Sequence, residues 1–325
     1  MMVGDMVNEK QKGLAYSIQS FLCNAGSLVG FLFPFIFTWI GISNIAPQGV
    51  VPDSVIYSFY IGAAILILCV IYTTVKVKEM PPAEYAEYHG ITEEEKKEKI
   101  NMVKLLVKAP KAFWTVGLVQ FFCWFAFMFM WTYTNGSVAA NVFDAPTVET
   151  VVNGASKVVL DTKSIQYQNA ADWVGVLFAV QAIGSVLWAV CIPLFKNRKQ
   201  IYSLSLVLGG IGFISTYFVH NQYVLFISFL LIGCAWAAML ALPFTILTNA
   251  LSGGHMGTYL GLFNGTICIP QIVAATLGGS ILALFTPKGM LPPEINMLVM
   301  AGVMLIIGAV CVYLIKETKG EEAKA

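Results

Sequence analysis

The side chains best suited to hold a polar ligand recur at the spacing of one helical face along a long apolar run. Gln120, Trp124, Phe127 and Trp131 follow one another at steps of four, three and four residues, and Asn135 lies one turn further on. Residues at these spacings share one face of an α-helix. Aromatic rings stack on the apolar face of a sugar, and amides bond to its hydroxyl groups, a mixture typical of polar-ligand pockets. The pattern indicates a sugar-binding face, while aromatic packing in a helix bundle or an aromatic belt at the membrane interface explains the same residues.

A second apolar run carries a stripe of small and polar residues. Steps of four and three residues connect Gly257, Gly261, Asn264, Cys268, Gln271, Ala275 and Gly278. Such a face either packs closely against another helix or lines a wet cavity, and both interpretations stay open. Pro270 leaves a backbone carbonyl without its helical donor one turn earlier and allows a kink. We expect substrate contact from Asn264 and Gln271, and helix packing or gating from Gly257, Gly261, Pro270 and Gly278.

Two shorter polar stripes complete the set of candidates. Asn24 lies among serines in the first apolar run, and Gln181 is followed by Ser185 and Trp188 in another. Amides and hydroxyls in membrane helices bond across helix contacts, so packing is the favoured interpretation of both stripes. Substrate contact is the alternative, and on that hypothesis Asn24 and Gln181 join Gln120, Trp124, Trp131 and Asn135 as binding residues.

Patterns for catalysis and for metal binding are absent from the sequence. No GxSxG, HExxH or P-loop motif occurs, and no CxxC pair is found among the seven cysteines. The three histidines have no metal-ligand spacing, and no basic cluster alternates with stacking aromatics in a polar setting. We therefore expect no enzyme activity, no catalytic residue, no metal, no cofactor and no nucleic-acid partner.

Composition places the chain in the membrane class. Of its 325 residues 58% are hydrophobic and only 11% are charged, against about a quarter charged in soluble proteins. The mean hydropathy is +0.74. Eight apolar runs are long enough to cross a hydrocarbon core of about 30 Å, near residues 14–41, 56–76, 112–135, 173–195, 201–219, 223–248, 257–285 and 296–315. The sequence thus predicts an all-α integral membrane protein with about eight transmembrane helices, whose lipid environment is its first partner.

The distribution of basic residues predicts how these helices are oriented. Sixteen of the 19 Lys and Arg residues fall on the side of the N-terminus, and only Lys157, Lys163 and Lys288 fall on the other side. Basic residues are enriched in cytoplasmic loops, so we expect a multi-pass protein of the cytoplasmic (inner) membrane with both ends in the cytoplasm. The N-terminal stretch lacks the apolar core and cleavage site of a signal peptide.

The spacing of the runs predicts three parts. Two spans in residues 1–78 precede a long charged cytoplasmic segment at 79–111, and six spans follow in residues 112–325, with a long outside loop at 136–172. Many transporters consist of two six-span halves joined by a long cytoplasmic loop. On that template the chain has a complete second half and the last two spans of a first half.

Several segments carry a family likeness. The stretch "GTYLGLFNGTICIPQIVAATLGG" with the preceding "LPFTILTNALSGGHM" resembles the eleventh-span region of the sucrose-transporter-like branch of the glycoside–pentoside–hexuronide:cation symporters, within the major facilitator superfamily. "VGDMVNEKQKGLAYSIQSFLCNAGSLVG" is similar to the stretch from the end of the fourth span into the fifth, and "WFAFMFMWTYTNG" to the seventh span. The resemblance implies that the eight runs are spans five to twelve of a twelve-span fold, the first four being absent.

The resemblance also implies a function. It suggests transport of an α-glucoside or disaccharide by alternating access, proton-coupled in a full-length form, with the sugar and protons as small partners. The second, fifth and eighth runs would face lipid, and these are the runs without a mid-span amide. Two features depart from the family: Trp131 and Tyr133 stand where plant sucrose carriers have acidic residues, and "KNRK" is all that remains of a basic loop. A truncated, non-transporting fragment and a carrier of another substrate, such as an efflux carrier, are the alternatives.

Overall fold

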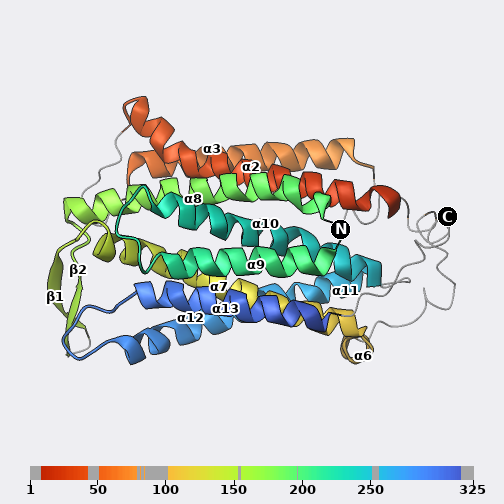
Figure 1. Ribbon diagram of the computed structural model, residues 1–325. Coiled ribbons are helices and arrows are strands. Elements are labelled where there is room, and N and C mark those ends of the chain that lie inside the picture. Colours follow the sequence, from red (N-terminus) through yellow and green to blue (C-terminus); the bar gives the residue numbers. More distant parts are fainter. Residues whose placement is uncertain are drawn as a thin grey trace.

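The predicted spans are helices in a computed structural model that describes residues 9–42, 51–78, 81, 84, 102–152, 155–195, 197–250 and 256–315 (Figure 1). The long helices are α2 (Glu9–Trp39), α3 (Asp53–Lys76), α7 (Lys111–Asn141), α8 (Ile165–Cys191), α9 (Arg198–Ser215), α10 (Leu225–Ala250), α12 (Gly265–Phe285) and α13 (Ile295–Cys311). The short ones are α6 (Met102–Val107), α11 (Met256–Phe263), η1 (Ile192–Leu194) and η2 (Val312–Leu314). Each of the eight predicted runs coincides with one long helix, except that α11 and α12 share the seventh run.

Six helical segments of the described chain are long and apolar enough to cross a membrane: Asp53–Lys76, Lys111–Asn141, Ile165–Leu194, Leu225–Thr248, Gly257–Phe285 and Ile295–Leu314. Helix α2 contains a shorter apolar stretch, Phe21–Phe33, and α9 has only 18 residues. Helices suit this environment because each satisfies its own backbone hydrogen bonds where no water is available. The all-α membrane class is thereby confirmed, while spanning by α2 and α9 stays a prediction.

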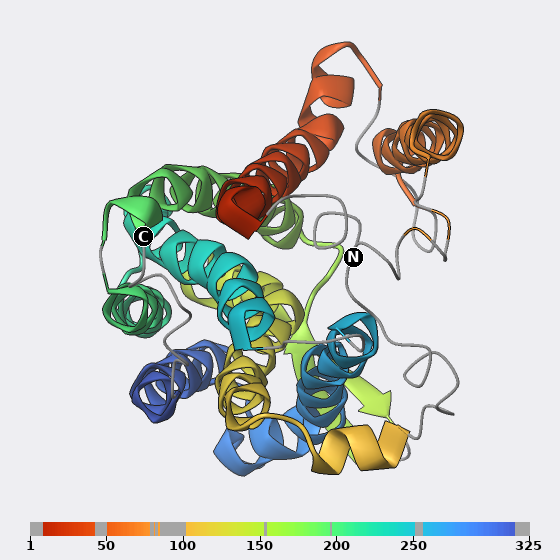
Figure 2. The ribbon, with the colours of Figure 1, turned by 90° about the vertical axis from the view of Figure 1, so that its right-hand side faces the viewer.

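Successive helices run in alternating directions side by side, and α7 lies at the centre of the bundle with α2 and α3 to one side (Figures 1 and 2). Burial follows this arrangement. Within the most apolar 18-residue stretch of each helix, 67% of the residues are buried in α7 and 61% in α10, against 6% in α3. The apolar side chains that α3 exposes are those expected to meet lipid, in agreement with its lack of amides.

Glycines allow the helices around α7 to approach closely. A Cβ added at Gly184 of α8 would lie 2.6 Å from the carbonyl oxygen of Leu230 in α10. A Cβ added at Gly302 of α13 would lie 2.7 Å from the carbonyl oxygen of Gly210 in α9. Small residues at such contacts permit the van der Waals packing that holds membrane helices together.

A β-hairpin, which the sequence prediction lacked, caps one end of the bundle (Figure 1). Strands β1 (Thr147–Val152) and β2 (Ala155–Leu160) pair antiparallel, with Thr147 opposite Leu160 and Val152 opposite Ala155. The connection is also shorter than the predicted loop at 136–172, because α7 continues to Asn141 and α8 begins at Ile165. We call this the hairpin end of the bundle.

At the opposite end, only part of the charged segment at 79–111 lies within the described residues. Its helix α6 is followed by Pro110, which precedes the first residue of α7, a position where a missing backbone N–H costs nothing. The hydroxyl of Tyr259 in α11 donates a hydrogen bond to the carbonyl oxygen of Leu105 at 3.2 Å. This bond ties the segment to the start of the seventh predicted span.

Candidate functional site

An aromatic cluster joins α7 to α10. The ring of Trp236 in α10 lies 4.9 Å from Phe127, 5.8 Å from Trp124 and 5.8 Å from Trp131, measured between ring centroids. Trp124 and Trp131 are themselves 6.4 Å apart. Tilted and edge-on contacts at these distances are the favoured geometry of aromatic pairs, so the four rings pack as one cluster.

Two polar atoms on the same face of α7 have no hydrogen-bond partner among the described residues. They are Nε1 of Trp124, in a side chain only 8% exposed, and Oδ1 of Asn135. The amide nitrogen of Asn135 donates to the hydroxyl of Tyr167 in α8 at 2.9 Å. Buried polar atoms are nearly always bonded, so two unpaired ones on one helix face are an exception that calls for an explanation.

Trp131 lies between these atoms, seven residues after Trp124 and four before Asn135. These steps place the three side chains on one face, with the outer two separated by about 16 Å along the helix axis. Trp131 is 43% exposed, so its ring is open to a ligand. The face thus carries a buried donor, an exposed aromatic ring and a buried acceptor in a row, bordered by Trp236 and Tyr167.

Gln120 has a different position from the rest of the predicted stripe. Its side chain is 0% exposed, its amide nitrogen donates to the carbonyl oxygen of Met239 in α10, and its oxygen accepts from the hydroxyl of Tyr202 in α9. Both bonds are long, at 3.4 Å. The amide is therefore occupied within the bundle, and substrate contact by Gln120 stays a prediction.

Asn24 and Gln181 are likewise buried at helix contacts. The hydroxyl of Ser185 in α8 donates to Oδ1 of Asn24 in α2 at 3.0 Å, which joins the first predicted part of the chain to the last. Gln181 is 5% exposed, and its backbone carbonyl lies where a Cβ at Gly233 of α10 would be. The structure thus places both residues between helices, as the packing interpretation requires.

The small-residue stripe of the seventh run lies mostly on an exposed face. The helix is interrupted at Asn264, between α11 and α12, two turns before the buried Pro270, and Asn264 is exposed while Gln271 is half-buried. A Cβ at Gly257 or Gly261 would meet no described atom within 4 Å. The close packing expected at these two glycines is not seen, and a gating role there stays a prediction.

Gly278 is the member of the stripe that packs closely. A Cβ there would lie 2.6 Å from the hydroxyl oxygen of Tyr133 in α7 and 3.4 Å from the ring of Phe129. The structure thus brings Gly278 against the centre of the bundle, on a face of α7 that differs from the one carrying Trp131.

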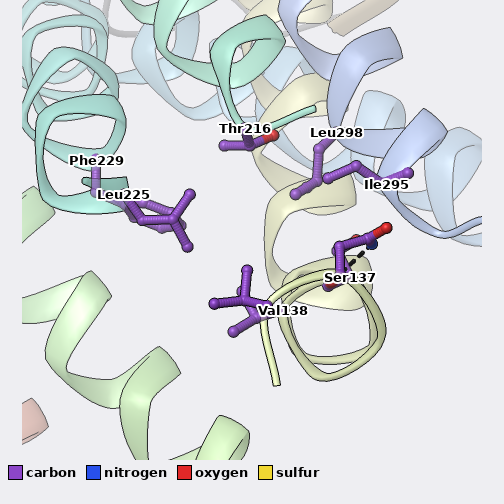
Figure 3. Close-up of a pocket in the computed structure, with 9 residues that line it drawn as sticks. Ser137, Val138, Thr216, Leu225, Phe229, Ile295 and Leu298 are labelled. Carbon is purple, nitrogen blue, oxygen red and sulfur yellow. Dashed lines mark hydrogen bonds between the residues drawn. The ribbon is translucent and has the colours of Figure 1, made fainter. Parts of the chain in front are cut away.

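A small cavity lies near the hairpin end between α7, α10, α13 and the end of α9 (Figure 3). It has a volume of about 10 Å³ and is lined by Ser137, Val138, Asn141, Val142, Thr216, Leu225, Phe229, Ile295 and Leu298. Such a space holds about one water molecule. It is far too small for a sugar, so the open face at Trp131 is the better candidate for a substrate.

Sequence reasoning missed Trp236 and Tyr167, which border the site from α10 and α8. Neither belongs to a polar stripe, so only the packing of the helices identifies them. Among the described residues no three His, Cys, Asp or Glu side chains come together to hold a metal ion.

The apolar helices of the bundle indicate a membrane protein, and the family comparison identifies its class. The model of the Major Facilitator Superfamily matches residues 1–160 and 147–325. The chain therefore belongs to this superfamily and is a membrane transport protein, not an enzyme.

Two further comparisons add little to this assignment. A solved structure described as a bacterial homologue of the human lysosomal transporter Spinster, inward-facing and occupied, is 17% identical. The match covers 96% of this chain and 71% of the transporter chain, with a TM-score of 0.49. A search of curated proteins gave no match. The sucrose-transporter-like branch within the superfamily stays a prediction.

Proposed function

We propose that the protein takes part in proton-coupled import of a sugar, an α-glucoside or disaccharide, by alternating access. The observation that carries this proposal is the row formed by Trp124, Trp131 and Asn135. A sugar stacks its apolar face on an aromatic ring and exchanges hydrogen bonds through hydroxyls that both donate and accept. The unpaired N–H of Trp124 and the unpaired oxygen of Asn135 supply the two kinds of partner.

In this proposal the substrate lies on the α7 face between Trp236 and Tyr167, while Gln120, Asn24 and Gln181 stabilise the helices behind it. Asn264 and Gln271 contribute from the exposed face of α11 and α12, where the interruption at Asn264 supplies a hinge. Transport requires no covalent chemistry, only two arrangements of the helices around one site.

A carrier of an amphipathic, largely apolar substrate is the second candidate. It is favoured by the aromatic cluster itself, which offers four rings and only two free polar atoms. Such a substrate would use the ring surface and leave Asn135 Oδ1 without a role.

Binding of labelled disaccharide to the purified protein tests the proposal. We expect Trp131→Ala to weaken binding by about 1–2 kcal/mol through loss of the stacked ring, roughly tenfold in affinity. Asn135→Leu should weaken it comparably, because the amide can no longer bond to a hydroxyl. The matched control is Trp114→Ala, which removes a 52% exposed tryptophan near the other end of the same helix and should leave binding unchanged.

The outcomes separate the two candidates. Equal affinity in the Trp131→Ala and Trp114→Ala variants would remove Trp131 from the site. Tight binding of an amphipathic, largely apolar compound that is sensitive to Trp131 but not to Asn135, with no sugar binding, would favour the second candidate.

A further inference from the structure

Glu294 is a half-buried acidic side chain at the hairpin end, where α13 meets α7, and Asp161 is half-buried at the same end. Glu294 precedes the first residue of α13, and its carboxylate occupies the place where a Cβ at Gly136 of α7 would be. By contrast, Asp144, Glu149 and Asp172, which flank the same end of the bundle, are exposed. Gly136 therefore provides a cradle that any larger residue would fill with its own side chain.

The surroundings of this carboxyl group are poor in charge. Tyr133, one turn before Gly136, faces it from α7, and the hydroxyl of Tyr133 packs against Gly278 of α12. The last two turns of α12 contain no ionisable residue. The first ionisable residue after the end of α9 is Tyr217, which is exposed. Lys288, in the connection before α13, is exposed, and within the described part of the chain no basic residue forms an ion pair with Glu294.

Burial without a charged partner disfavours the ionised carboxylate. It raises the pKa of Glu294 from 4.5 to about 7. The side chain is therefore neutral in the folded protein at mildly acidic pH and becomes charged as the pH rises through 7. Because the folded-state pKa is the higher one, the folded form is favoured below about 4.5 and loses this advantage as the pH rises from there to 7.

The seam that Glu294 occupies is incompletely filled. The small cavity shown in Figure 3 lies next to it, with Ser137 following Gly136 on α7 and Ile295 following Glu294 on α13. A charged carboxylate in this position gains by moving toward water, and the adjacent cavity has space for about one water molecule. A neutral carboxyl group has no such reason to leave.

We propose that Glu294 is a proton-binding site that decides whether α13 stays packed on α7 at the hairpin end of the bundle. The proposal rests on the transport function proposed above, because α7 carries the Gly136 cradle on one face and Trp131 on another. Proton binding and substrate binding then bias the same helix, which is the physical requirement for coupling between two sites. One proton is taken up by a carboxylate oxygen from the solution at the hairpin end and returns there when the seam opens.

The first test measures the proton itself, by infrared difference spectroscopy of the carboxyl groups in protein reconstituted into vesicles without substrate. The native chain should show a carboxyl group titrating near pH 7, and Glu294→Gln should abolish that signal. The matched control, Glu149→Gln, removes an exposed carboxylate of the hairpin and should leave the signal intact. A signal that persists in Glu294→Gln, or its absence from the native chain, would overturn the proposal.

Changing the cradle provides a second variant. Gly136→Ala places a methyl group where the carboxylate lies, so the carboxyl group should move toward water and titrate more than one pH unit lower. Gly279→Ala, at a helical glycine whose added Cβ meets no described atom within 4 Å, is the control and should not shift the titration. An unshifted midpoint in Gly136→Ala would contradict the proposed cradle.

The second test measures the seam. Leu298 of α13 is 2% exposed and lines the cavity, so a cysteine there, in a background with the seven native cysteines replaced, reports whether the seam is open. Its rate of labelling by an impermeant maleimide should be divided by that of an exposed cysteine at Lys157, which corrects for thiol ionisation. The ratio should rise several-fold between pH 5 and 8, and it should stay low in Glu294→Gln.

A ratio independent of pH in the native background would refute the gate. Both tests use no sugar, so a failure of the sugar proposal shows up only in the disaccharide-binding experiment and leaves these results to be judged separately.

Discussion

Individual side chains show how far helical spacing predicts a site. The step pattern correctly placed Trp124, Trp131 and Asn135 on one face of α7. It could not show that Gln120, one turn away, has its amide bonded to Met239 and Tyr202 of neighbouring helices. Spacing gives the direction of a side chain within its own helix, whereas the partner on the next helix depends on packing that no local pattern contains.

The glycines of the seventh run lead to a prediction at the same scale. Gly278→Leu should destabilise the protein by about 1–3 kcal/mol, because the added side chain collides with Tyr133 in a filled contact. Gly261→Leu adds the same atoms where no described atom lies within 4 Å and should have little effect. Thermal unfolding of the two purified variants in one detergent makes the comparison, and equal losses would argue that Gly261 also meets a neighbour.

Among the elements, the helices were predictable and the hairpin was missed for an identifiable reason. The sequence "TVETVVNGASKVVL" places Asn-Gly between two runs rich in β-branched residues, a strong hairpin signal. It lay inside a segment interpreted only as a loop between spans. Pro270 was expected to allow a kink near the carbonyl of Thr266, whereas α11 and α12 are divided at Asn264, two residues before that carbonyl.

The contact between α2 and α8 gives a prediction for a pair of elements. Asn24→Ala and Ser185→Ala should each destabilise the protein, and the double variant should lose less than the sum of the two, because both remove the same hydrogen bond. Bonds of this kind between membrane helices contribute about 0.6 kcal/mol on average and at most about 1.7 kcal/mol.

The control for this cycle lies on the same helix. The hydroxyl of Ser27 bonds to the carbonyl oxygen of Cys23 within α2, so Ser27→Ala should show no coupling with Ser185→Ala. Strictly additive losses for Asn24 and Ser185, measured by denaturant unfolding, would mean that the bond does not hold the two helices together.

For the whole molecule, hydropathy was the informative signal. All eight apolar runs became helices because a long apolar stretch has no other way to satisfy its backbone in lipid. Their packing around α7 was not predictable in the same way, since the contacts depend on glycines such as Gly184, Gly210 and Gly302, whose partners lie on other helices. The exception is α3, whose exposure followed from its uninterrupted apolar composition.

The side of the membrane on which each end of the bundle lies is a prediction from charge alone. With the basic loops in the cytoplasm, the hairpin end faces outward. In a cysteine-free background, Lys157→Cys in β2 should react with an impermeant maleimide in intact cells, because it is exposed at that end. Arg198→Cys, exposed at the start of α9 at the opposite end, should react only after the membrane is opened. Reaction of both from outside would refute the eight-span arrangement, because an odd number of crossings lies between β2 and α9, and the reverse pattern would invert the molecule.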